Sequence, residues 1–75
     1  MSTPLVLFER FVALDDVRSV LRIAAEDVAG ESSVALYVES DGARAVEPLL
    51  RVPPRALREL ARALDRLAGQ LGVQP

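Results

Sequence analysis

The segment "DDVRSVLRIAAEDVAG" at residues 15–30 decides the fold, because its apolar residues satisfy the spacing of a helix and that of a strand. As a helix over residues 16–29, it begins at a capping aspartate and ends at Gly30. As a strand, it places Arg18 and Arg22 on one face and its larger aliphatic residues on the other. Capping residues at both ends favour the helix, and the strand stays open as the alternative.

The next segment indicates a hairpin. Residues 34–40, "VALYVES", alternate apolar and polar positions as a half-buried strand does. Asp41 and Gly42 follow, and this pair favours a tight turn whose two central residues have positive φ. The returning strand is predicted at residues 44–52, where Pro48 cannot donate to a neighbouring strand. We therefore expect this strand at an edge of the sheet, or a bulge at Pro48.

The two ends of the chain complete the fold class. Residues 5–14, "LVLFERFVAL", predict a strand that is apolar on both faces. A helix capped by Thr3 with Pro4 at its first position is the alternative. Pro53 and Pro54 stop the last strand and suit the first turn of a C-terminal helix. The prediction is an α+β fold, a small antiparallel sheet of β-α-β-β-α order, alternatively β-β-β-β-α, packed by a C-terminal amphipathic helix.

The chain of 75 residues has room for one domain, residues 1–75, with residues 70–75 expected as a loose tail. Apolar residues make up 51% of the chain and aromatic residues only 4%, so its core must be built from small and aliphatic side chains. A lone core of this size supplies about 3–5 kcal/mol of stability. We therefore expect self-association, with a homodimer as the default.

Cysteine and histidine are both absent. Their absence removes the commonest general base, the thiolate nucleophile and nearly all zinc, haem and iron–sulfur ligand sets. The four glycines match no phosphate-binding loop. The sequence therefore predicts no enzyme, cofactor or metal site. No signal peptide or membrane span is recognisable, and we expect a cytoplasmic protein without a membrane partner.

The last helix has two contrasting sides. Four leucines at heptad spacing form a seam suited to packing on the sheet or to a dimer: Leu57, Leu60, Leu64 and Leu67. Four arginines lie on the other side: Arg55, Arg58, Arg62 and Arg66. An arginine face is most often simply solvated, but it is also suited to phosphates or to a carboxylate-rich surface.

The charge of the chain is unevenly distributed. Residues 1–50 hold four arginines against nine acidic residues, a net charge of −5, whereas residues 51–75 hold five against two, a net charge of +3. The basic part can attract a nucleic acid, an acidic protein or the acidic part of a second copy.

A second candidate patch exists in the four-strand alternative. There Arg18 and Arg22 share a sheet face that Tyr37 can also join, and a basic sheet with an aromatic ring can hold single strands. With "YVESDGARAVEP" at residues 37–48 and a closing helix, that order resembles the small dimeric PC4-like and Pur-like domains. The resemblance implies single-stranded nucleic-acid binding by a dimer.

The favoured interpretation is a non-enzymatic interaction or regulatory module. We expect a homodimer that presents a surface to another macromolecule, at the uncovered sheet face or at the edge strand near Pro48. The alternative function is single-stranded nucleic-acid binding through arginines. The sequence does not identify a protein partner.

Overall fold

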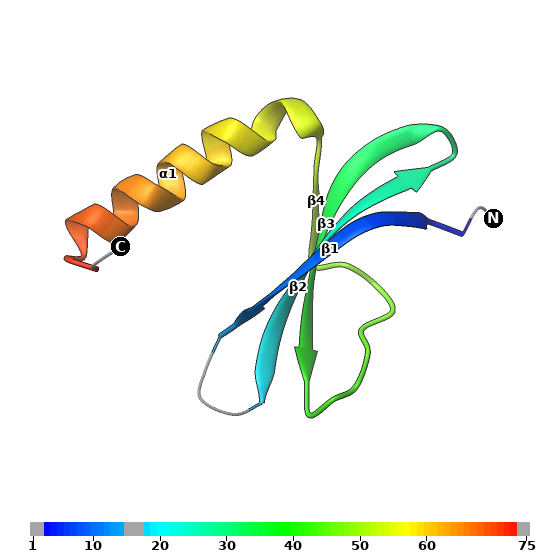
Figure 1. Ribbon diagram of the computed structural model, residues 1–75, viewed down its shortest axis with the longest axis horizontal. Coiled ribbons are helices and arrows are strands. Elements are labelled where there is room, and N and C mark those ends of the chain that lie inside the picture. Colours follow the sequence, from blue (N-terminus) through cyan, green and yellow to red (C-terminus); the bar gives the residue numbers. More distant parts are fainter. Residues whose placement is uncertain (1–2, 15–17, 74–75) are drawn as a thin grey trace.

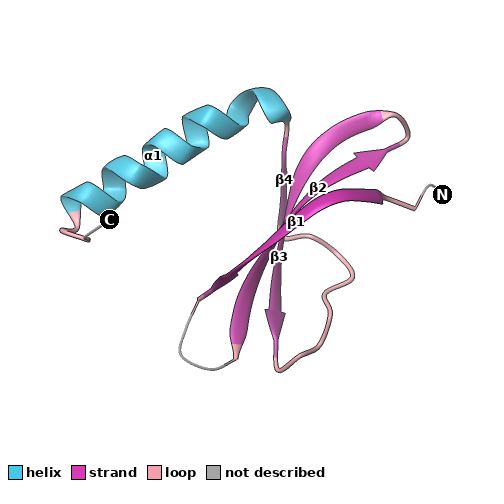
Figure 2. Ribbon diagram, viewed as in Figure 1, coloured by secondary structure: helices cyan, strands magenta, loops and turns pink. Residues whose placement is uncertain are grey.

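The computed structural model describes residues 3–14 and 18–73, and it contains four strands followed by one helix (Figures 1 and 2). The elements are β1 (Leu5–Ala13), β2 (Ser19–Val28), β3 (Glu31–Ser40), β4 (Leu50–Val52), the 3-10 turn η1 (Pro54–Ala56) and α1 (Leu57–Gln70). Consecutive strands pair antiparallel in the order β1-β2-β3-β4. The α+β class is confirmed, in the β-β-β-β-α order.

The prediction of a helix over residues 16–29 is wrong, because β2 occupies most of this segment. Its side chains alternate between the two faces of the sheet, and Arg22 and Glu26 are buried. On a helix these two residues would form a local pair, whereas on the strand they bind side chains far away in the sequence. The aspartates at positions 15 and 16, expected as helix caps, lie outside the described residues.

Two tight turns connect the long strands. The turn between β2 and β3 has positive φ at Ala29 (53°) and Gly30 (84°), so the glycine ends a strand rather than a helix. The predicted turn at Asp41 (φ 56°) and Gly42 (φ 75°) is confirmed. The returning strand is much shorter than expected, since β4 begins only at Leu50, and it lies at the sheet edge as predicted.

The sheet has two dissimilar faces. The face that we term the charged face buries five side chains of β2 and β3, namely Arg22, Ala24, Glu26, Ala35 and Tyr37. The loop between β3 and β4 lies against it, and Ala45 of this loop packs on the buried alanines and the tyrosine. The core of the single chain is therefore small and partly ionic.

The opposite face, which we term the apolar face, is built mainly from apolar side chains, although the register also places Arg10 and Asp27 on it. Residues paired directly across antiparallel strands share a face. The register thus places the following residues together: Leu21, Ile23, Val34, Leu36, Val38, Leu50 and Val52, with Phe8 and Val12 from β1. Only Val52 of this set is buried.

Helix α1 leaves the top of β4 and runs away from the sheet (Figure 1). None of its residues is buried. The radius of gyration of the chain is 13.9 Å, compared with about 11 Å expected for a compact chain of this length. The expected packing of the helix on the sheet is therefore confined to the start of the helix.

An apolar space of about 200 Å³ separates the first turns of α1 from the apolar face. It is lined by Leu57, Leu60, Ala61 and Leu64 of the helix and by Leu21, Ile23, Val34, Leu36 and Val52 of the sheet. The first part of the leucine seam and the apolar face therefore face the same apolar space.

The helix α1 is too short to cross a bilayer, and none of the described residues forms a helix that could do so.

Candidate interaction surfaces

Arg22 is the centre of the charged face. Its Nε donates to Glu39 at 2.9 Å, and one terminal nitrogen donates to the Ala45 carbonyl at 3.2 Å. The other terminal nitrogen lies 3.5 Å from a Glu9 carboxylate oxygen. The guanidinium also stacks on the ring of Tyr37, 3.9 Å from its centroid. Arg22 is 3% exposed, so its charge is stabilised almost wholly by these partners.

Glu26 is the second buried charge and also has specific partners. Its carboxylate accepts a hydrogen bond from the Tyr37 hydroxyl at 2.7 Å and another from Arg51 at 2.9 Å. Burial raises the pKa of Tyr37, and the hydrogen bond to Glu26 raises it further. The tyrosine hydroxyl therefore stays protonated and keeps donating to the buried carboxylate.

Glu39 joins the loop to the sheet. Its carboxylate accepts a hydrogen bond from the backbone N–H of Ala45 at 2.9 Å, in addition to the one from Arg22. The Ala45 N–H lowers the pKa of Glu39 most, and Arg22 lowers it further. These bonds hold residues 43–49 against the charged face, which explains why the chain does not return directly as a long fourth strand.

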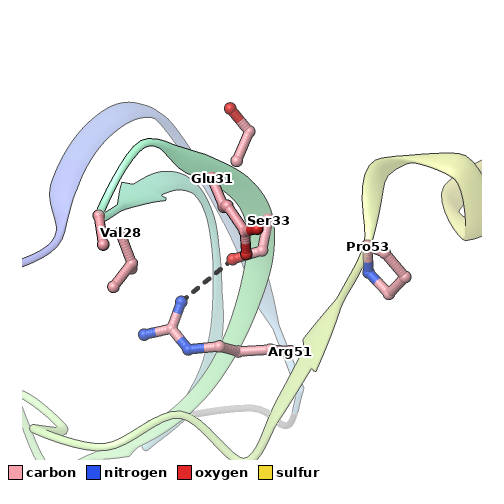
Figure 3. A pocket seen from close by; sticks show the side chains of 7 residues that line it. Val28, Glu31, Ser33, Arg51 and Pro53 are labelled. Carbon is pink, nitrogen blue, oxygen red and sulfur yellow. Dashed lines mark hydrogen bonds between the residues drawn. The ribbon is translucent and has the colours of Figure 1, made fainter.

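A hollow of about 490 Å³ lies beside the β2–β3 turn (Figure 3). Its only arginine, Arg51, donates to Ser33 at 3.3 Å and to Glu26. Val28, Glu31 and Pro53 complete much of the wall. Because the guanidinium is engaged by the buried Glu26, the hollow presents no unneutralised cation among the described residues.

The patch predicted for the four-strand alternative is brought together in part. Arg22 and Tyr37 are direct partners across β2 and β3, as a strand over this segment predicts. Arg18 precedes the strand, is exposed and pairs with Asp41 at 3.6 Å. Since the Tyr37 ring is buried and covered by a paired arginine, it does not form an open stacking platform in this conformation.

The arginines of the C-terminal segment have a different environment. Arg55 lies on η1, and Arg58, Arg62 and Arg66 lie on α1; all four are exposed. Among the residues that the structure describes, none of these four takes part in an ion pair. The positive charge of these four arginines is therefore not neutralised by a direct ion pair with any described acidic side chain.

The leucine seam is exposed along the helix. Leu57 and Leu60 are half-buried at the start of α1, whereas Leu64 is 57% and Leu67 53% exposed. The sequence identified this seam, but it did not identify the apolar face, because that face depends on the strand register of β2. The signal that could have revealed the apolar face was the strand-like alternation of apolar residues within residues 15–30.

Sequence reasoning also missed part of the ion pairs and hydrogen bonds on the charged face. Glu26 is buried and shared by Tyr37 and Arg51. Its partners lie 11 and 25 residues away along the chain, beyond the reach of local spacing rules.

Among the described residues, no group of three or more acidic side chains is placed to hold a metal ion. The chain matches no known protein family, no curated protein and no solved structure. The argument for function therefore rests on the surfaces described above.

Proposed function

We propose that this protein is a small, non-enzymatic interaction module that works as a homodimer in the cytoplasm. One observation carries the proposal: the single chain buries charged side chains and exposes most of its large aliphatic ones, which is the inverse of an ordinary protein core. Among the described residues, two charged ones, Arg22 and Glu26, are buried, while the buried apolar ones are only Ala24, Ala35, Tyr37 and Val52. Most of its large aliphatic side chains remain at the surface.

The inversion has an energetic consequence. Burying a large aliphatic or aromatic side chain contributes about 1.5–3 kcal/mol, and the single chain obtains little of this from its apolar face. Large contiguous apolar patches on a protein surface mark interaction sites. A second copy is the simplest partner, because it brings an identical apolar patch.

The dimer would leave other surfaces for a further macromolecule. β4 pairs with only three residues of the ten-residue β3, from Val34 to Leu36. Among the described residues, the rest of that edge pairs with no further strand, and only Ser40 forms an isolated bridge, to Ala43. We place the docking site for a partner's extended segment at this edge.

The test of self-association is the molar mass measured by light scattering over a wide range of protein concentration. The wild-type chain should have the mass of two copies, and its thermal midpoint should rise with concentration. Leu64→Glu, which adds a charge to the exposed seam, should lower the mass to that of one chain.

Val46→Glu is the matched control, because Val46 is 91% exposed in the β3–β4 loop and lies outside the apolar face. It adds the same charge and should leave the mass unchanged. A wild-type protein that stays monomeric at all concentrations would overturn the proposal.

Nucleic-acid binding is the second candidate function, and the unpaired arginines of α1 favour it. Phosphate contacts of this kind are strongly salt-dependent. Labelled single-stranded oligonucleotides should bind at about 50 mM salt and weaken by a factor of ten or more at about 200 mM if three or more phosphates are contacted. Replacing Arg58, Arg62 and Arg66 by glutamine should abolish binding, and binding that persists would exclude this helix face.

A further inference from the structure

We infer that α1 of each copy lies on the apolar face of the other copy, so that the two chains complete each other's cores reciprocally. This inference rests on the proposed self-association and specifies which surfaces meet. It replaces the expectation that the helix packs on the sheet of its own chain.

The connection between sheet and helix prevents the helix from covering its own sheet. β4 ends at Val52, and Pro53 and Pro54 lead directly into η1, so the chain has little length in which to fold back. The helix therefore diverges from the sheet (Figure 1), and the space between them is lined by apolar side chains of both. Another apolar element has to fill this space.

The exposed apolar surface is large enough for a stable interface. Seven large side chains on the helix and the apolar face are between 42% and 80% exposed: Phe8, Val12, Val38, Leu50, Leu64, Leu67 and Leu71. With roughly 100 Å² of exposed surface each, they provide roughly 700 Å². A stable interface needs about 800 Å² from each partner, and half-buried neighbours such as Ile23 and Leu36 supply the remainder.

Several charged side chains lie away from the proposed contact. Arg58, Arg62 and Arg66 lie opposite the leucine seam, and the carboxylates of Glu9, Glu26 and Glu39 interact on the charged face. The leucine seam and the apolar face line one apolar space, so a partner helix that enters this space covers both surfaces at once. Packing helix on helix alone would leave the apolar face of each copy open to water.

Two-fold symmetry makes the same arrangement self-consistent. In a two-fold dimer, a contact from the helix of one copy to the sheet of the other occurs twice. Both leucine seams and both apolar faces are then covered by one arrangement. The arginines Arg58, Arg62 and Arg66, which lie opposite the seam, remain on the outside.

A complementation experiment tests the inference. One variant carries Leu64→Glu and Leu67→Glu on the helix, and the other carries Val38→Glu and Leu50→Glu on the apolar face. These four side chains are exposed in the single chain, so the substitutions preserve its internal contacts. Each variant alone should be monomeric, because both reciprocal contacts then contain a damaged surface.

Mixing the two variants distinguishes the arrangements. In the reciprocal dimer, the intact helix of the sheet variant meets the intact sheet of the helix variant, so one of two contacts is restored and the mass doubles. In a like-on-like dimer, every contact contains a damaged surface, and both variants stay monomeric. Folded variants that remain monomeric when mixed, beside a dimeric wild type, would overturn this inference and leave the proposed self-association intact.

Thiol cross-linking provides a second measurement that keeps the apolar surface nearly intact, and the natural chain has no cysteine to interfere. A Leu67→Cys chain is mixed with a mass-tagged Val38→Cys chain and treated with a short bifunctional thiol reagent. Cross-links should join the two different variants, and Arg66→Cys, on the outer side of the helix, should link at least tenfold less. Links only between identical variants would overturn the inference.

Discussion

The two faces of the sheet differ in how their side chains are stabilised. On the charged face, Arg22 and Glu26 are buried, and their polar groups find partners within the chain at 2.7–3.5 Å. On the apolar face, side chains that need no specific partner remain open to water. The directional interactions of Arg22 and Glu26 are satisfied within one copy, whereas the apolar side chains would need a second molecule to cover them.

The two faces of the sheet contribute differently to the folding of this small chain. The network of Arg22, Glu26, Tyr37, Glu39 and Arg51 fixes the strand register and holds the β3–β4 loop. Buried ionic groups contribute specificity more than net stability, because their desolvation offsets much of their attraction. The apolar face would then supply most of the stability once it is covered.

Removing the central arginine should have the largest effect. Arg22→Ala leaves Glu39 and Glu9 without their buried cation and uncovers the Tyr37 ring. Breaking a buried ion pair from one side costs about 3–5 kcal/mol, comparable with the whole stability of a lone core of this size. Urea denaturation followed by circular dichroism should show a largely unfolded chain.

Arg44→Ala is the matched control for that variant. Arg44 also contacts Glu9, at 3.3 Å, but its side chain is mostly exposed. An exposed pair contributes about 0–1 kcal/mol. Equal losses in the two variants would contradict the distinction between buried and exposed charges on this face.

A smaller loss is expected when only one hydrogen bond of the network is removed. Tyr37→Phe keeps the ring under Arg22 but removes the donor to the buried Glu26 carboxylate. Leaving a buried acceptor without its partner costs about 1–3 kcal/mol, measurable as a shift of the urea midpoint. Ser33→Ala removes a longer and exposed hydrogen bond from Arg51 and should change the stability by less than about 0.5 kcal/mol.

The sequence predicted those parts of the fold that depend on local patterns. A strand forms over all but the last of residues 5–14, Asp41 and Gly42 form a tight turn, and a helix follows Pro53 and Pro54. Each signal lies within a few residues and has a local physical cause, such as positive φ or the fixed φ of proline. The alternation of residues 34–40 was also sufficient to predict β3.

The remaining features depend on contacts between distant residues. The segment at residues 15–30 has both periods, and its choice between helix and strand is decided by partners such as Glu39 and Arg51. Tertiary contacts routinely override such local preferences. The divergence of α1 from the sheet likewise follows from the direction in which β4 leads into η1, which no residue pattern encodes.

A small gain in stability is expected from the turn between β2 and β3, which belongs to neither face. Ala29 has a φ of 53°, a left-handed conformation that costs an alanine roughly 1 kcal/mol. Asparagine tolerates this conformation, and Asn-Gly is the preferred pair for a two-residue hairpin turn. Ala29→Asn should therefore stabilise the protein by about 0.5–1 kcal/mol in urea denaturation. Because the substitution touches neither surface, the dissociation constant of the dimer should not change, and a change in it would mean that the turn takes part in the interface.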